Sequence, residues 1–401
     1  MPLFEYEAKT LQGMPIKGKM DAISEDAVSG VLREKGYFPT VIRKKSGIMN
    51  MDLEVLQGVK IKDIAVFCRQ FSVIINAGIP VLKGLEIVKN QTDSKKLKRV
   101  LTEVFEDVQK GKTLSVAMKK HKDFPAMLTN MVIVGEASGT LDVILERMSV
   151  FYEKESALNQ KIKGAMTYPI AVSVVAVGVV ILLLTKVLPI FSDMLLSSGG
   201  ELPLPTRIMM GISDTIRTKW YLLLIILVIF IAAIKLYIDT PTGRQAFDQM
   251  KLKFPLFGKL YCKIMTARFA RTFGTLIGNG MPLLGSIDIC SALLGNVIIQ
   301  DILSSTNEDI KKGLGIGEAL ETRSIFPPML TQMIKVGEEA GTLETILEST
   351  AGFYDNEVDT ATEQMTNLIQ PIIIVILAVI VGFIIISIML PMVEMYQTIS
   401  G

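Results

Sequence analysis

The sequence carries one short stretch twice: GEASGTL at residues 135–141 and, 202 positions later (337 − 135), GEEAGTL at residues 337–343. Glycines near both ends of each copy are typical of a turn that ends one helix and starts the next. A long segment with apolar residues at helical spacing follows each copy, and a wholly apolar span follows that segment. The stretch therefore predicts the elbow between two helices of a repeated module.

The offset of 202 positions also holds far outside the elbows. It relates arginines, glycines, prolines and aromatic residues in helices, in turns and beside apolar spans. The pairs are Phe67/Phe269, Arg69/Arg271, Phe71/Phe273, Gly78/Gly280, Pro80/Pro282, Gly111/Gly313, Phe124/Phe326, Pro125/Pro327, Phe151/Phe353, Tyr152/Tyr354, Pro169/Pro371 and Pro189/Pro391. Because unrelated helices would not keep register through turns and prolines, the sequence predicts a tandem direct repeat.

Each module is predicted to be a bundle of six helices. Apolar residues recur at helical spacing, and glycine and proline separate the segments, since glycine ends helices and proline fits their first turn. The bundles are expected over residues 60–165 and 262–367. The clearest positions that end and start these helices are Gly78, Pro80, Gly280 and Pro282.

The elbow is predicted to end the fifth helix of each bundle at its first glycine and to start the sixth at its threonine. The sixth helix is expected to continue from its bundle into an apolar span. Pro169, and Pro371 in the second copy, lie at that junction, where a proline kinks a helix. The elbow residues singled out are Gly135, Glu136, Gly139, Leu141, Gly337, Glu338, Gly341 and Leu343.

Three apolar spans, at residues 170–188, 220–238 and 372–390, predict transmembrane helices. Each has about the 20 residues that a bilayer core requires, and none carries a charge at its centre. Half of all residues are hydrophobic and the mean hydropathy is +0.44, which is high for a soluble protein. The fold class is therefore a mainly α, multi-pass membrane protein.

The repeat also predicts the topology. The first and third spans are copies and run in the same direction, so the second span returns the chain between them. Both bundles then lie on one side of the membrane, and a loop (189–219) and a tail (391–401) lie on the other. Because the first sixty residues hold no apolar core of a signal peptide, the bundles are expected in the cytoplasm.

The remaining segments are short. Residues 1–45 read as a small ββαβ unit, in which Ser24 caps the helix. Residues 46–59 are predicted to be a linker, and the polar, basic residues 239–261 a connector between the second span and the second bundle.

The composition argues against several kinds of binding and catalytic site. The net charge of +2 suggests no direct contact with nucleic acid, and a single histidine nearly excludes a histidine-based metal centre or a Ser/His/Asp triad. The three cysteines have no metal-ligand spacing. The KGKT at residues 110–113 resembles the end of a phosphate loop, but the earlier glycine is Glu106 and no strand precedes it. No catalytic residue, metal or cofactor is therefore expected, and the protein is not expected to be an enzyme.

Two acidic features leave alternatives open. Glu136 and Glu338 either cap backbone N–H groups or point at a basic partner. The sixth helices also carry acidic side chains that form either a solvated face or a site for a divalent cation. These side chains are Glu153, Glu155, Asp355, Glu357, Asp359 and Glu363.

Several motifs occur in order along the whole chain: Tyr6-x-Ala8 with Gly13, Arg69-Gln70-Phe71, Gly78-Ile79-Pro80, Gly135-Glu136-x-Ser138-Gly139-x-Leu141, Tyr168-Pro169 and Leu202-Pro203-x-Pro205-Thr206. With these motifs the chain resembles the family of the type II secretion system F protein (GspF) and the type IV pilus inner-membrane platform protein PilC. The second copy departs at Glu339-Ala340, where the first has Ala137-Ser138, and at Gln370, where the first has Tyr168. The two copies are therefore expected to contact different surfaces.

This resemblance implies an inner-membrane platform that relays the work of a cytoplasmic assembly ATPase to pilin or pseudopilin subunits in the bilayer. The partners that the resemblance implies are the assembly ATPase or a retraction ATPase, other inner-membrane assembly proteins and membrane lipid. It also implies further copies of the chain, in a dimer or higher oligomer. The machine is a type IV pilus, a type II secretion system or a DNA-uptake filament. The alternative is a transporter or channel with paired cytoplasmic regulatory bundles, although the spans lack the central charges typical of transporters.

Overall fold

A computed structural model gives the fold of this chain as two compact units. The first unit is Met1–Val59 with Asp93–Arg99, and the second is Lys60–Thr92 with Val100–Gly401. The residues that the structure describes are 3–10, 14–22, 24–44, 58–197, 202–255 and 257–400. Gly13 and most of the predicted linker 46–59 lie outside them.

The N-terminal unit has the predicted ββαβ order. Within the described residues its sheet has three strands in the order β2-β1-β3, with β1 antiparallel to both neighbours. Phe4 of the sheet packs with Val28 and Leu32 of helix α1 to form a small core, and the Ser24 hydroxyl accepts a hydrogen bond from the Ala27 N–H (3.2 Å). The elements are β1 (Leu3–Lys9), β2 (Pro15–Asp21), α1 (Glu25–Glu34) and β3 (Phe38–Lys44).

Each repeat forms six helices in the described residues, which confirms the predicted mainly α fold. The helices of the first repeat are α3 (Ile61–Asn76), α4 (Val81–Gln91), α5 (Lys95–Gln109), α6 (Leu114–Lys119), α7 (Ala126–Ser138) and α8 (Leu141–Leu182). The helices of the second are α13 (Phe257–Gly278), α14 (Leu283–Leu294), α15 (Val297–Lys311), α16 (Ile316–Glu321), α17 (Pro328–Ala340) and α18 (Leu343–Ser400).

The repeat extends to the packing of aromatic rings. Phe67 and Phe71 of α3 stack with ring centroids 5.5 Å apart, and Phe269 and Phe273 of α13 do so at 5.4 Å. All four rings are buried, so each bundle is built around the same pair, which contributes its burial and an aromatic contact to stability.

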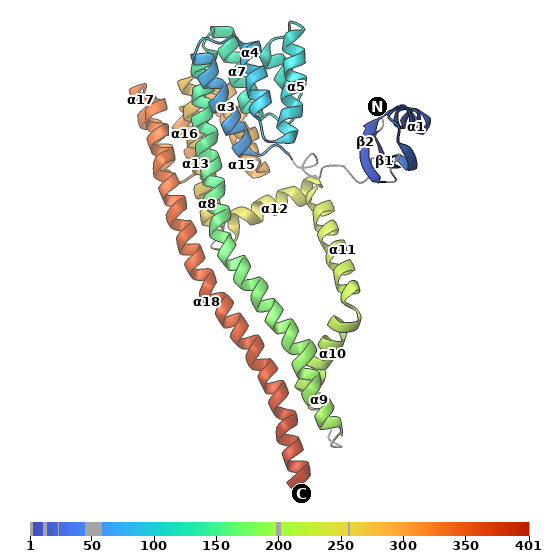
Figure 1. Cartoon of the computed structure of the whole chain (residues 1–401). Coiled ribbons are helices and arrows are strands. Elements are labelled where there is room, and N and C mark those ends of the chain that lie inside the picture. The colour runs from blue at the N-terminus through green and yellow to red at the C-terminus, as the bar shows by residue number, and fades with distance from the viewer. Residues whose placement is uncertain are drawn as a thin grey trace. The chain divides into compact units, whose positions relative to one another are not determined.

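The sixth helix of each repeat leaves its bundle as a long rod, as Figure 1 shows for α8 and α18. Helix α8 has 42 residues and α18 has 58. Helix α8 continues through Pro169, which lies inside it, into a five-residue π-helical segment, η1 (Leu183–Val187), and then α9 (Leu188–Ser197). One uninterrupted helical path therefore joins each elbow to an apolar span.

Three helical segments of the described chain are long and apolar enough to cross a membrane, as predicted. They are Leu141–Ser197, Trp220–Ile238 and Leu343–Leu390. The middle one is helix α11, and none of its side chains is buried against the rest of the described chain.

The predicted loop at residues 189–219 is wrong, because most of this segment is helical. It contains α9 and α10 (Leu204–Thr218). The prolines that suggested a loop, Pro203 and Pro205, lie at the start of α10, where proline fits a helix. The hydroxyl of Ser213 on α10 donates to the Leu184 carbonyl in the π-helical segment (2.6 Å).

Helix α10 also contacts α18, because the Thr206 hydroxyl donates to the Ser387 carbonyl (2.6 Å). Leu184 and Leu188 pack with Ile384 in an apolar cluster that partly buried methionines of α10 join. Helix α10 therefore ties the far ends of the first and third spans together, where the sequence had indicated only a connection.

The predicted connector at 239–261 is mainly helical as well. It contains α12 (Pro241–Lys253) and the start of α13. The second bundle thus begins at Phe257, five residues before the predicted 262.

Candidate functional site at the junction of the two repeats

The two elbows have the same geometry. Helix α7 ends at Gly139 and α17 at Gly341, both with left-handed φ values of 72° and 67° that favour glycine. The other elbow glycines lie inside these helices, which corrects the predicted helix end at Gly135. A Cβ on Gly135 would lie 3.1 Å from the Leu141 Cα, so this glycine allows the sixth helix to approach the fifth.

Glu136 and Glu338 each cap the fourth helix of their own repeat. The Glu136 carboxylate accepts hydrogen bonds from the N–H groups of Leu114 (2.6 Å) and Ser115 (3.1 Å) at the start of α6. The Glu338 carboxylate accepts from the Ile316 N–H at the start of α16 (2.9 Å). An anion at a helix N-terminus is stabilised by the free N–H groups and by the helix dipole. Of the two readings of these glutamates, the structure contains the capping contact.

The remaining predicted turn positions are structural. Gly78 and Gly280 have left-handed φ values of 77° and 75°, and Pro80 and Pro282 precede the first residues of α4 and α14.

The structure gives the repeated arginines partners that the sequence did not. Arg69 on α3 pairs with Glu153 on α8 (Nε–Oε1 3.0 Å). Arg271 on α13 pairs in the same way with Asp355 on α18, which is the repeat counterpart of Glu153. Each arginine therefore fastens the first helix of its bundle to the sixth.

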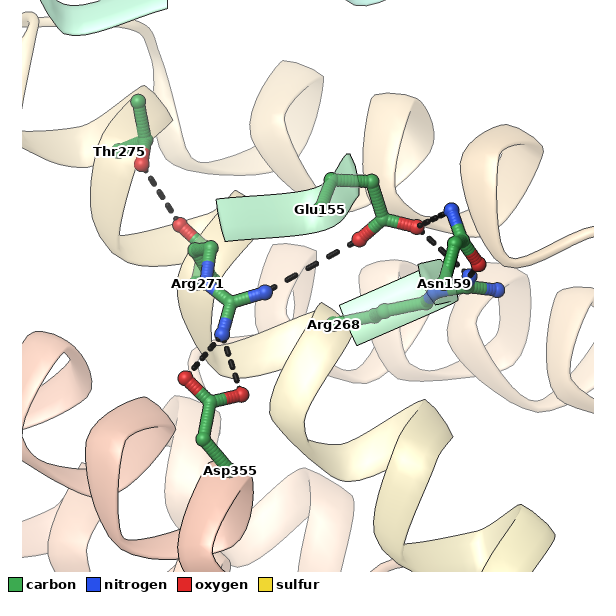
Figure 2. Close-up of polar contacts among 6 residues, drawn as sticks. All are labelled: Glu155, Asn159, Arg268, Arg271, Thr275 and Asp355. Carbon is green, nitrogen blue, oxygen red and sulfur yellow. Dashed lines mark hydrogen bonds and ion pairs between the residues drawn. The ribbon is translucent and has the colours of Figure 1, made fainter. Parts of the chain in front are cut away.

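Arg271 has a second acidic neighbour, on the other repeat. Its Nη1 lies 3.9 Å from Glu155 Oε2 of helix α8. Glu155 also pairs with Arg268 of α13 (Nη2–Oε1 2.6 Å). Figure 2 shows Glu155 between the two arginines.

Asn159, one turn beyond Glu155, completes this cluster. Its side-chain amide donates to Glu155 (3.3 Å), and its oxygen accepts from Arg268 (2.8 Å). Figure 2 shows that these groups come from α8, α13 and α18. We call Glu155, Asn159, Arg268, Arg271 and Asp355 the junction cluster. Because its charged groups are largely buried, removing one of them would leave its partner without a compensating charge.

Three more exposed ion pairs join α8 to the second repeat along the same seam. Each pairs a base on α8 with an acid on α18, and Arg147 also donates to the Gly278 carbonyl (3.0 Å). The pairs are Arg147–Glu344 (3.0 Å), Lys154–Glu348 (3.8 Å) and Lys161–Asp359 (2.6 Å).

The same ion pairs could not form if the two repeats exchanged places. The positions of α18 that correspond to Arg147, Lys154 and Lys161 are Ser349, Asn356 and Glu363. The charges therefore favour one arrangement of the two repeats, in which the basic side chains of α8 in the first repeat face α13 and α18 of the second.

An open cleft of about 410 Å³ lies beside the seam. Arg147, Lys154 and Arg271 contribute its bases, and Val150 and Phe151 part of its apolar wall. Five of the six acidic side chains of the sixth helices named above pair with arginine or lysine, and the sixth, Glu363, is exposed. Glu357, for example, pairs with Lys263 (2.7 Å). Part of this acidic face is solvated, since the side chains of Glu153 and Glu357 are 44% and 37% exposed. Within the described residues, no group of three or more His, Cys, Asp and Glu side chains is close enough to hold a metal ion.

The two prolines lie where the long helices leave the bundles. Pro169 and Tyr168 of α8 border a cavity of about 50 Å³ together with Gln370, Ile373 and Ile374 of α18. The corresponding positions 168 and 370 of the two repeats are thus neighbours at the start of the spans.

Arg268 and the bases of the seam were not predicted from the sequence. Their signal is a departure from the repeat, because Arg268 corresponds to Val66, and Lys161 to Glu363. A charge that is present in only one copy indicates a surface that the two copies do not share. Here that surface is the contact between the two repeats.

Two helical repeats, each continued by one helix into an apolar span, define a multi-pass membrane protein built by duplication. Residues 67–189 and 269–391 each match the family described as type II secretion system (T2SS), protein F, and residues 1–43 match the N-terminal domain of that protein. The chain therefore belongs to the type II secretion system protein F family, as its motifs predicted.

Proteins similar along the whole chain carry two kinds of name. Type IV pilus assembly protein PilC of Thermus thermophilus is 37% identical over 404 residues, all of both chains. PilC of Myxococcus xanthus is 37% identical over 391 residues, 97% of this chain and 94% of its own. Type II secretion system protein F of Xanthomonas campestris is 31% identical over 410 residues, all of both chains.

Proposed function

We propose that this protein is the inner-membrane platform of a type IV pilus or type II secretion machine, and that it relays the work of a cytoplasmic ATPase to pilin or pseudopilin subunits in the bilayer. Its family and the names of its relatives support the general role. The observation that carries the relay is that α8 and α18 each run without a break from an elbow to a span.

The junction supports a relay in which the two rods move together. Three exposed ion pairs and the buried junction cluster fasten α8 to the second repeat. A force that tilts either bundle therefore acts on both rods, and α10 links them again at the far ends of the spans through Leu184 and Ser387.

The proposed orientation has both bundles in the cytoplasm. Lysines 154, 161 and 163 precede the first span, and basic residues follow the second, as expected for segments on the inner side. A membrane-impermeant maleimide tests this orientation. A cysteine introduced at exposed Val116 of α6 should label only after permeabilisation, and one at exposed Leu196 of α9 should label in intact cells, once the outer membrane, where there is one, is made permeable.

The elbows are the proposed contact for the ATPase. Since Glu136 and Glu338 cap helices within the bundles, charge reversal there would damage the fold as well as the surface. Glu339, exposed beside the second elbow, offers a cleaner test. Glu339→Lys should reduce ATPase recovered by crosslinked pull-down, and the matched change Glu363→Lys on the distal part of α18 should not.

The relay itself is tested by breaking a rod outside the bundle. A Gly-Gly insertion after Gly164 interrupts α8 beyond its last ion pair with α18, at Lys161. In cells that lack their own copy, this variant should insert into the membrane but fail to assemble filaments or secrete. The same insertion after Gly313, in the turn before α16, serves as the control and should assemble. Normal assembly by the first variant would contradict the relay.

Pull-down from membranes tests the partners separately. Recovery of a secretion-type ATPase together with prepilin-like proteins is expected. Substrate flux through liposomes that contain the protein alone would instead favour a transporter or channel.

A further inference from the structure

Helix α12 lies in a position that the platform role does not explain. It begins at Pro241, and only Asp239 and Thr240 separate it from the end of the apolar helix α11 at Ile238. The Thr240 hydroxyl accepts from the Gly243 N–H (3.1 Å) and caps α12 at once. Figure 1 shows α12 running across the direction of α11. A helix that turns away from a span within two residues starts at the membrane surface.

The exposed charge of this segment is positive only. Asp248 is the only acidic residue in positions 241–259 of the sequence, and it is 2% exposed. Arg244, Lys253 and Lys259 are all exposed.

Large apolar side chains lie exposed among these bases. Met250 is 51%, Phe254 49% and Phe257 42% exposed. An exposed apolar and aromatic group flanked by bases, next to a span, is the composition of a helix that lies in the interface of a bilayer.

Buried contacts fix which face of α12 turns toward the bundle. The Asp248 carboxylate accepts from the Val297 N–H at the start of α15 (3.0 Å) and pairs with Lys251 (2.9 Å). The Asn296 amide donates to the Asp248 carbonyl (3.4 Å). With this face held by the second bundle, the opposite face cannot rotate inward to cover its apolar side chains.

We propose that residues 241–259, with α12 at their centre, bind the headgroups of anionic phospholipids and seat the second bundle on the bilayer. Charge complementarity selects the anionic lipid, since three exposed bases meet no exposed acid in this segment. Continuity with the span selects the membrane as the occupant. Phe254 and Phe257 enter the boundary between headgroups and acyl chains, and Arg244, Lys253 and Lys259 contact phosphates.

Depth-dependent quenching of a probe at position 254 tests this site in the full chain. The background is Cys262→Ser, because Cys68 and Cys290 are fully buried and burial raises the pKa of both thiols, which keeps them unreactive. Phe254→Cys carries an environment-sensitive fluorophore, and Val336→Cys, exposed on α17, serves as the control site. The protein is reconstituted into vesicles of phosphatidylcholine with or without phosphatidylglycerol, with brominated acyl chains as quenchers.

The probe at 254 should be quenched in vesicles with phosphatidylglycerol, and quenching should fall about twofold in pure phosphatidylcholine or at high salt. Replacing Arg244, Lys253 and Lys259 by glutamine should lower quenching by the same factor. Replacing both lysines by arginine instead, which keeps the positive charge, should leave quenching at the level of the unaltered protein. The matched triple change Lys110→Gln, Lys119→Gln and Lys311→Gln should leave quenching unchanged.

Absence of quenching at 254 would overturn the proposal, as would quenching that ignores phosphatidylglycerol and the three bases. Protection of the probe only when an acidic protein is added would assign the surface to a protein partner instead. An unchanged protease pattern shows that each variant is folded.

Discussion

Arg69 and Arg271 occupy the same position of the two repeats, yet the side chain of Arg69 is 49% exposed and that of Arg271 only 7%. Both pair with the acid at the same position of the sixth helix. The difference arises because α8 of the first repeat covers Arg271, whereas the corresponding surface over Arg69 stays open. The chain thus contains one ion pair in two environments, which makes each the control for the other.

Arg271→Ala should destabilise the protein far more than Arg69→Ala. Removing Arg271 leaves Asp355 partly buried and takes a base from the vicinity of Glu155, and breaking a buried pair costs about 3–5 kcal/mol. An exposed pair such as Arg69–Glu153 contributes about 0–1 kcal/mol. Denaturant unfolding of the full chain in detergent measures both, and equal losses would contradict the burial of the junction.

The structural features that the two repeats share could be predicted from the sequence. Shared landmarks such as Gly78, Pro80 and Phe67 predicted the six helices of each bundle, because the same turn and core residues fix them twice. The contact between the bundles was not predictable in this way. It depends on Arg268 and Lys161, which have no like-charged counterpart in the other copy.

Two further differences have local physical causes. The prolines at 203 and 205 suggested a loop, but they fit the first turn of α10, so a helix start was taken for a break. Glu136 was correctly read as a possible cap, but its target, the start of α6, lies 22 residues earlier in the chain. Spacing alone does not reveal such a contact.

Removing the charge of either capping glutamate should weaken its bundle. Glu136→Gln and Glu338→Gln each lose a charged acceptor at a helix N-terminus, which costs about 1–2 kcal/mol. Glu339→Gln, at the exposed neighbour of Glu338, should change stability by less than about 0.5 kcal/mol. Thermal unfolding of the three variants decides this, and a neutral Glu136→Gln would return that residue to the role of a surface contact.

Replacing two glycines by alanine, one at the elbow and one inside α8, should change the free energy of unfolding in opposite directions. Gly139→Ala places a Cβ on a left-handed residue (φ 72°), at a cost of about 1–2 kcal/mol. Gly164→Ala lies inside helix α8 with no atom within 4 Å of the added Cβ, and should stabilise by about 0.5–1 kcal/mol. Measured unfolding free energies of opposite sign are expected. A stabilising Gly139→Ala would contradict the elbow geometry.

Asp107 should make the first bundle sensitive to acid. Hydrogen bonds from Lys112 (2.7 Å) and Lys120 lower the pKa of Asp107 to about 2, below its ordinary value of 3.8. A carboxyl with a lowered pKa stabilises the fold above its unfolded pKa and loses that contribution as the pH falls toward its folded pKa. The contribution is therefore complete above about pH 4–5 and declines toward pH 2.

Asp107→Asn should lower the thermal stability of the full chain in detergent at pH 7, and the difference from the unaltered protein should vanish as the pH approaches 2. Asp309, the repeat counterpart, gives a second test, since Arg323 and Lys312 also lower its pKa. Lys112→Met should reproduce part of the loss at pH 7, because it removes the first donor to Asp107. A stability difference between Asp107→Asn and the unaltered protein that stays constant from pH 7 to pH 2.5 would show that the carboxylate charge is not what holds this turn.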